Sequence, residues 1–287
     1  MDKFGRNYIL TVGVPGGGSL TVTLPFTIEF DVKRDFFSGA NTASIRVYNL
    51  SEDHRKQIIH DPQDWDLNQN FQIMAGYGNN LSIIAKGKIS RAWSVREHDN
   101  FVTQIEAYDF WSKTTADDFN LAFPSRSSMK SVLTSIANNL VTPDGLSLGV
   151  IGDSFGGNLA RANVYSGSSV YHLYSLTGGG FFIDNQKIFC LGTFECIRGD
   201  LDVINSKTGL LSTPVRYESF LTFDILFEPR LAIGQLISLE SSTMNNFNGY
   251  YKVCAIHHQG MISDAVCGKA VTKVSLLYGK NLVEILQ

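Results

Sequence analysis

The most enzyme-like string of the chain is Gly152-Asp153-Ser154, which follows an apolar stretch and precedes a pair of glycines. A serine at such a turn can act as a nucleophile when a histidine takes its proton and a carboxylate orients that histidine. The candidate bases are His257 and His258, but no aspartate lies three residues before either of them. The sequence therefore offers a serine without the pair that would activate it.

The same string resembles the first block of the GDSL-type esterases. In those enzymes the block lies near the start of the fold, whereas here it begins at residue 152. A trypsin-like Gly-Asp-Ser-Gly-Gly sequence is also missing, because Phe155 interrupts it. We therefore expect a glycine-rich loop at this place and no enzyme, with a GDSL-like serine hydrolase as an alternative.

Glycine clusters at 16–18, 156–157 and 178–180 could cradle a phosphate group. A P-loop needs Gly-Lys-Ser/Thr at its end, and none of the three has it. None stands between a strand and a helix in the pattern of a dinucleotide site either. We expect turns at these positions and no cofactor.

The histidines give no metal-binding pattern. His257 and His258 are neighbours on an expected strand, so their side chains point to opposite faces. His54 and His60 are six residues apart, unlike the histidines of zinc-binding helices, which are four apart. We expect no metal site.

The four cysteines, Cys190, Cys196, Cys254 and Cys267, show no CxxC spacing. Cys190 and Cys196 flank a Gly-Thr turn and could form a disulfide, although two free thiols are the favoured interpretation. So few cysteines agree with a reducing compartment.

The composition excludes several classes of protein. The 287 residues carry a net charge of −3 with a sequence pI of about 6.1, and no run of Lys or Arg forms a basic stripe. Binding to specific nucleic-acid sequences is therefore not expected, because neutralised phosphates supply most of that affinity. The first residues lack a signal peptide's apolar core, and no window approaches 18 apolar residues. We expect a soluble protein.

The elements that position these residues begin with strands. From Leu20 to Val32 every even residue is apolar, which predicts one strand with a buried face and a bulge or edge position at Pro25. A strand over Tyr8–Val14 and a hairpin turn over Pro15–Gly18 precede it. Further strands and a short helix with Ser51 at its N-cap follow, and they predict a β-barrel or compact sandwich that ends near residue 115.

The middle of the chain has a different pattern. Ser127 is expected to cap a helix whose apolar residues run from Met129 to Leu140 at helical spacing. A second helix is expected over Ser169–Thr177, with Gly178 as its C-terminal cap. A hairpin that turns at Asp184-Asn185 follows it. Together these elements predict a small α+β module.

Alternation returns after Thr213. Val215, Tyr217 and the apolar residues from Leu221 to Phe227 are expected to share one face of a strand. The complete prediction is a mainly β protein in which two β-barrel domains, at 1–115 and 209–287, flank an α+β module at 116–208.

Two stretches resemble the baseplate hub proteins of contractile-tailed bacteriophages, of the late-control or tail protein D type. The first runs from Phe26 to Ile58 and resembles their opening barrel. The second resembles their closing barrel and runs from residue 208 to 279. The positions that carry the likeness are Asn41, Tyr48, Asn49, Leu50, Ser51, Gly209, Pro214, Pro229, Gly234, Gly249, Tyr250 and Val253.

The resemblance implies a structural subunit that forms a homotrimer, in which two tail-tube-like barrels per chain build a pseudo-sixfold ring. The implied partners are the tail tube protein, the central spike protein and other baseplate proteins, and DNA would pass through the channel. The implied location is the tail baseplate of the virion, assembled in the host cytoplasm. The other alternative is a different tail ring component, a tube-end or distal adaptor protein, which would have one barrel.

Overall fold

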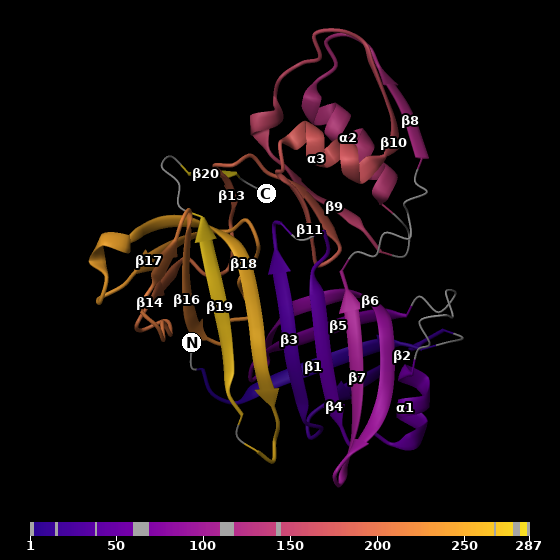
Figure 1. The fold of residues 1–287 in the computed structure, drawn as a ribbon, viewed down its shortest axis with the longest axis vertical. Coiled ribbons are helices and arrows are strands. Elements are labelled where there is room, and N and C mark those ends of the chain that lie inside the picture. The colour runs from indigo at the N-terminus through magenta and orange to yellow at the C-terminus, as the bar shows by residue number, and fades with distance from the viewer. Residues whose placement is uncertain are drawn as a thin grey trace.

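A computed structural model describes residues 3–14, 17–37, 39–59, 69–109, 118–141, 145–266, 268–277 and 282–285. Figure 1 shows a body of strands and, above it, a smaller part that holds two of the three α-helices found in these described ranges. Three clusters of buried apolar side chains define an N-terminal, a middle and a C-terminal unit. The chain is mainly β, as the sequence predicts.

The N-terminal unit encloses its core between two layers of strands. In Figure 1 strands cross behind the front layer that contains β3, β4 and β7. The bulged strand β6 joins the layers, because its first half pairs with β5 and its second half with β7. The elements are β1 (Arg6–Gly13), β2 (Ser19–Thr23), β3 (Ile28–Asp35), β4 (Thr42–Tyr48), α1 (Glu52–Ile58), β5 (Asn70–Tyr77), β6 (Asn80–Glu97) and β7 (Asn100–Tyr108).

The single strand predicted from Leu20 to Val32 is wrong, because the chain turns at Leu24-Pro25 and forms β2 and β3. The amide of Phe26 donates to the carbonyl oxygen of Thr23 in this turn, at 3.2 Å. The alternation persists across the turn because the even residues of both strands face the same core. Of the predicted hairpin turn before β2, Pro15 and Gly16 lie outside the described residues, and β1 and β2 pair as expected.

The middle unit packs two helices against short strands. Its elements are β8 (Asp118–Phe123), α2 (Met129–Leu140), β9 (Ser147–Ile151), η1 (Asp153–Phe155), β10 (Asn163–Ser168), α3 (Ser169–Thr177), β11 (Phe181–Asp184) and β12 (Lys187–Cys190). The apolar face of α2 is buried as its spacing predicts, and α3 has the predicted bounds and the left-handed Gly178 at its end.

Two local predictions for this unit are wrong by one residue. Ser128 is the N-cap of α2, since the Ser127 hydroxyl donates instead to the carbonyl oxygen of Pro124 at 2.8 Å. The β11–β12 hairpin turns at Asn185 and Gln186, whose φ angles are +50° and +63°, in the manner of the left-handed two-residue hairpin turns.

The C-terminal unit contains β13 (Glu195–Ile197), β14 (Val203–Asn205), β15 (Val215–Tyr217), β16 (Phe220–Leu226), β17 (Leu236–Glu240), η2 (Asn245–Phe247), β18 (Gly249–Ile262), β19 (Ala270–Leu277) and β20 (Val283–Ile285). The face shared by Leu221, Phe223 and Ile225 is buried, as expected. Val215 and Tyr217 are exposed instead, because they lie on β15, which folds back on β16 as a separate outer strand.

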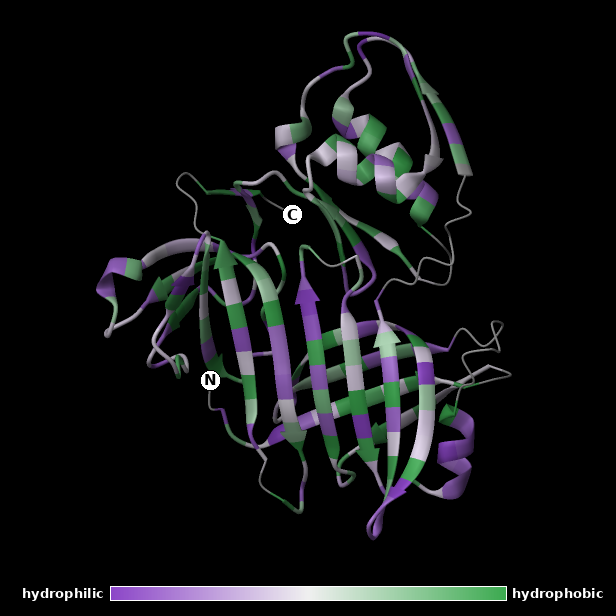
Figure 2. Cartoon of the chain, in the orientation of Figure 1, coloured by the Kyte–Doolittle hydropathy of each residue, from purple (hydrophilic) through white to green (hydrophobic). Residues whose placement is uncertain are grey.

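One sheet runs through both β-rich units. Strand β18 pairs with β3 from Asp35–Ala255 to Ile28–Ile262, and with β19 on its other side. Thirteen strands are thereby joined, and the pairings among the described residues close neither unit into a ring. Figure 2 shows polar and apolar residues alternating along the front strands, so that apolar side chains fill the cores and polar ones remain outside.

Candidate functional site: two buried polar joints between the units

The first joint is an ion pair between Arg34, on β3, and Asp184, at the end of β11. The Arg34 guanidinium donates to both carboxylate oxygens, at 2.7 and 2.6 Å, and its side chain is 3% exposed. It also donates to the carbonyl oxygen of Leu231 at 3.4 Å. This one side chain therefore touches all three units. Charges so deeply buried are tolerated only when they are paired in this way.

Asn41 and Asp109 complete the first joint. The Asn41 side-chain amide donates to the Asp109 carboxylate at 2.7 Å and to the carbonyl oxygen of Ile183 at 3.1 Å. The Asn41 backbone amide donates to the other Asp109 oxygen at 2.9 Å. Burial raises the pKa of Asp109 to about 7, and the nearby Asp184 carboxylate adds to this shift. Asn41 thus connects the Asp109 carboxylate to the end of β11, where Asp184 follows Ile183.

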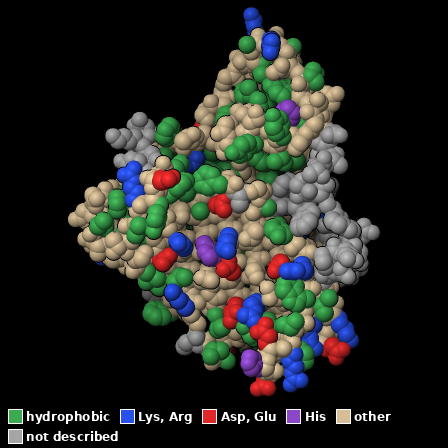
Figure 3. Space-filling model, in the orientation of Figure 1, with side chains coloured by type: hydrophobic (Ala, Val, Ile, Leu, Met, Phe, Trp, Pro, Cys, Tyr) green, Lys and Arg blue, Asp and Glu red, His purple; other side chains and the backbone are tan. Residues whose placement is uncertain are grey.

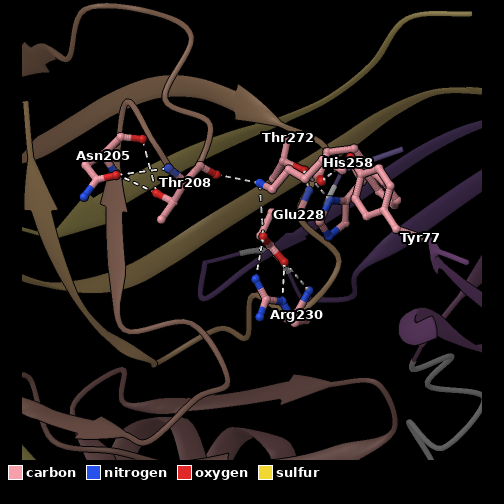
Figure 4. A network of polar contacts seen from close by, with 9 residues as sticks. Tyr77, Asn205, Thr208, Glu228, Arg230, His258 and Thr272 are labelled. Carbon is pink, nitrogen blue, oxygen red and sulfur yellow. Dashed lines mark hydrogen bonds and ion pairs between the residues drawn. The ribbon is translucent and has the colours of Figure 1, made fainter. Parts of the chain in front are cut away.

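The second joint is centred on Glu228, whose side chain is 3% exposed and lies between Lys3 and Arg230, as Figure 4 shows for the Arg230 side. Lys3 Nζ is 3.2 Å from one oxygen and Arg230 Nε is 2.7 Å from the other. Lys3 also donates to the carbonyl oxygen of Thr208 at 2.6 Å. Although burial opposes the charge of Glu228, the two cations lower its pKa overall. The start of the chain is thereby fixed to the C-terminal unit.

A neutral histidine extends this second joint into the seam between the two β-rich units. His258 Nδ1 lies 2.9 Å from the hydroxyl of Thr272, and that hydroxyl accepts a bond from the Glu228 backbone amide at 3.0 Å. The hydroxyl of Tyr77, from β5, donates to the carbonyl oxygen of Phe227 at 2.9 Å. Burial, and then the charge of Arg34, holds the pKa of His258 well below its ordinary value. The ring is therefore uncharged at neutral pH.

These joints connect the three units through buried polar contacts. Each consists of charged groups that are already paired with groups of the same chain. Such networks fix the relative arrangement of the parts that they connect. The first joint contains one of the positions that carried the family resemblance, Asn41.

The Tyr-Asn-Leu-Ser positions form a turn between β4 and α1. Asn49 has a φ of +59°, and its side chain accepts a bond from the Phe101 amide and donates to Asn100. Leu50 is buried, and the hydroxyl of Ser51 accepts a bond from the His54 amide as the N-cap of α1. The predicted cap is confirmed. The helix ends at Ile58.

The remaining resemblance positions are mostly turns and core residues of the C-terminal unit. Gly209 and Gly234 have φ angles of +108° and +85°, and a methyl group on Gly234 would lie 2.8 Å from Leu191 Cδ1. Tyr250 is 68% exposed, and the other positions either are buried or start β18. These other positions are Pro214, Pro229, Gly249 and Val253.

Ser154 lies in no catalytic arrangement. Its hydroxyl and its backbone amide both donate to Glu195, at 2.8 and 2.6 Å, and the Gly192 amide donates to the same carboxylate at 2.7 Å. No histidine contacts Ser154 in the part of the chain that the structure describes. The carboxylate therefore holds the glycine-rich loop in place.

The cysteines and histidines form no metal centre within the described ranges. Cys190, Cys196 and Cys254 are free and buried, so Cys190 and Cys196 do not form the disulfide that their spacing allowed. Cys267 lies outside the described residues. None of the helices in the described ranges has the length and hydropathy that crossing a bilayer requires.

The outer face of the shared sheet is polar and carries both signs of charge, as Figure 3 shows over the front strands. Arg46 bridges Glu29 and Glu97, at 3.1 and 2.5 Å, while His257 lies 3.0 Å from Asp31. The charges of this face therefore compensate one another locally.

The buried charges of the two joints were not predicted from the sequence, although a signal existed. Arg34 occupies the next even position after Val32 and so continues the inward face of the strand with a charge. Asp184 ends a run of buried apolar residues, and Glu228 directly follows the fully buried Phe227. A charge at an expected core position predicts a buried partner.

Comparisons with known proteins agree with this architecture. The family model described as "Baseplate hub gp41" matches residues 9–263. A 43 kDa tail protein of prophage MuSo2 from Shewanella oneidensis is similar in fold, with a TM-score of 0.59, 10% identity and coverage of 95% of this chain and 97% of that one.

Two further solved structures have the same fold. A tail protein from Neisseria meningitidis gives a TM-score of 0.54 at 10% identity, over 96% of this chain and 97% of that chain. A component of the type VI secretion system of E. coli gives a TM-score of 0.51 at 9% identity, over 94% of this chain and 77% of that chain. No curated protein sequence matches. Because the family model covers most of the chain, this protein belongs to the baseplate hub gp41 family of structural phage tail proteins.

Proposed function

We propose that the chain is a structural subunit of the tail baseplate that forms a homotrimer with pseudo-sixfold symmetry, joins the tail tube to the central spike and has no catalytic role. The observation that carries this proposal is the pairing of β3 with β18. It joins two β-rich units, each with its own apolar core, into one sheet. Three chains would then supply six β-rich units to one ring.

The proposed ring also accounts for the sheet's free edges. Strands β2 and β15 end the path of paired strands, and all three residues of β15 are exposed. Unpaired edges promote uncontrolled association unless a neighbour covers them. Closed symmetry with neighbouring copies is the common way for a subunit to cover such surfaces.

The polar outer face of the shared sheet suits the wall of a channel. Its ion pairs, such as Arg46 with Glu29, leave little uncompensated charge to retain a passing polyanion. We propose that DNA passes along this face without sequence-specific binding, and that the protein assembles into the virion tail in the host cytoplasm.

Native mass spectrometry of the purified chain, alone and with its tube and spike proteins, tests the proposal. We expect a trimer, either alone or after the spike protein is added. A strict monomer in the presence of both partners would contradict the hub role. A hexamer would instead favour another tail ring component.

A further inference from the structure

A cleft of about 640 Å³ lies where the three units meet, next to the Arg34–Asp184 pair. Its walls come from β6 of the N-terminal unit, from β9 and β12 of the middle unit, and from the turns at 198–200 and 229–232 of the C-terminal unit. This volume falls within the usual range of ligand pockets, about 300–1,000 Å³. Arg34 and Asp184 of the first joint and Arg230 of the second form part of its wall.

The charged side chains that line the cleft are five cations, Arg34, Lys86, Lys187, Arg198 and Arg230, and two carboxylates, Asp184 and Asp200. Positive charge therefore exceeds negative charge there, although the whole chain has a net charge of −3. Asp184 neutralises Arg34, and Glu228 neutralises Arg230. Lys86, on β6, and Lys187, on β12, both line the cleft, and neither forms an ion pair with a carboxylate of the described residues. Two ammonium groups are therefore available to an anionic ligand.

The shape of the cleft favours an extended ligand. Strand β9 is the outer strand of its three-stranded sheet, and its consecutive residues 148–150 line the cleft. An outer strand can pair with a further strand supplied by another protein. Ile83 and Leu148, which are 37% and 39% exposed, add apolar contacts on the two walls.

We infer that this cleft binds an extended acidic segment of another tail protein, which pairs along β9 and places its carboxylates between Lys86 and Lys187. The inference rests on the proposed function for the origin of the partner. Because the bound segment would touch all three units, it would fix their arrangement when the baseplate assembles.

Site-specific photo-crosslinking in assembled tail particles tests this inference. A benzoylphenylalanine is placed at Ile83 or at Leu148, and the linked peptides are sequenced by mass spectrometry. Both sites should link to the same acidic segment of a different tail protein. The same probe at Val95, which is 40% exposed on β6 but lies outside the cleft, should not link to that segment.

A paired variant tests the role of charge. Lys86→Gln with Lys187→Gln should lower the crosslinking yield at both sites by about fivefold or more, since two charged contacts are lost. The matched control is Lys207→Gln with Lys269→Gln, which removes two exposed lysines elsewhere and should leave the yield unchanged.

Several outcomes would overturn the inference: no link from either site, or a link to a second copy of this chain, to a neutral or basic segment, or to nucleic acid. An unchanged yield in the Lys86 and Lys187 variant would also overturn it. Absence of this chain from the particles would contradict the proposed function itself, and the cleft inference would fall with it.

Discussion

Arg34 and Asp184 are 150 residues apart in the sequence, yet they form a buried ion pair with two hydrogen bonds of 2.7 and 2.6 Å. Their side chains are 3% and 7% exposed. The pair connects the first β-rich unit to the hairpin of the middle unit, beside a carbonyl group of the C-terminal unit. The relative placement of the three units therefore depends on it.

Removal of one partner of this pair should destabilise the protein strongly. Asp184→Asn or Arg34→Gln leaves a buried charge without its counter-ion, which costs about 3–5 kcal/mol. Urea unfolding measures the loss. The combined variant Arg34→Met with Asp184→Leu should cost less than the sum of the single changes, because neither partner of the pair is left buried without the other.

The exposed pair of Glu52 and Lys56 is the matched control for that experiment. These side chains are 68% and 67% exposed, so water already screens their attraction. Glu52→Gln with Lys56→Gln should leave the unfolding midpoint unchanged. If the buried pair and the exposed pair lose equal amounts of unfolding free energy, the Arg34–Asp184 pair contributes no more to stability than a surface ion pair.

Asp109 should make stability depend on pH. Its pKa is about 7 in the folded chain, against an ordinary aspartate value of 3.8, so the folded state binds more protons between these values. Unfolding free energy should therefore fall as pH rises from about 4 to about 7 and level off above that. In Asp109→Asn this part of the slope should vanish. If unfolding free energy depends on pH in the same way in the unchanged protein and in Asp109→Asn, the raised pKa of Asp109 is wrong.

Lys252 should have the opposite effect at higher pH. Lys252 is 3% exposed, and burial lowers the pKa of its ammonium group to about 8 from 10.5. The unfolded chain binds the extra proton between these values, so stability should rise with pH from about 8 upward. The contribution of Lys252 is the unfolding free energy of the unchanged protein minus that of Lys252→Met, measured at each pH. If this difference falls or stays flat as the pH rises above about 8, the prediction is wrong.

Gly234 should not tolerate a side chain. Its φ is +85°, and an added methyl group would lie 2.8 Å from Leu191 Cδ1. Gly234→Ala should cost at least about 1–3 kcal/mol from backbone strain alone. Gly157→Ala is the control, since nothing lies within 4 Å of its methyl position. A Gly234→Ala protein as stable as the control would contradict the steric argument.

The sequence predicts the local elements well because their signals are local. The spacing of α2, the left-handed glycine after α3 and the cap at Ser51 all depend on neighbours within a few residues. The turn within the alternating stretch was missed because residues on both sides of Pro25 face the same core. Alternation reports which face is buried and not whether the strand is continuous.

The joints and the cleft could not be predicted in the same way. Arg34 contacts Asp184, and Lys86 and Lys187 come to line one cleft, only after distant segments pack together. The pairing of β3 with β18 also joins residues more than two hundred positions apart. Periodicity within either segment contains no information about these partners. What the sequence does contain is the anomaly of a charge at Arg34 in a core position.

Electron-microscopy class averages of the purified chain bound to its spike protein test the central proposal most directly. The proposal predicts a ring with a central hole, threefold symmetry and six similar β-rich densities around the channel. A particle with one β-rich density per subunit around the channel, or a single chain beside the spike with no ring, would contradict it.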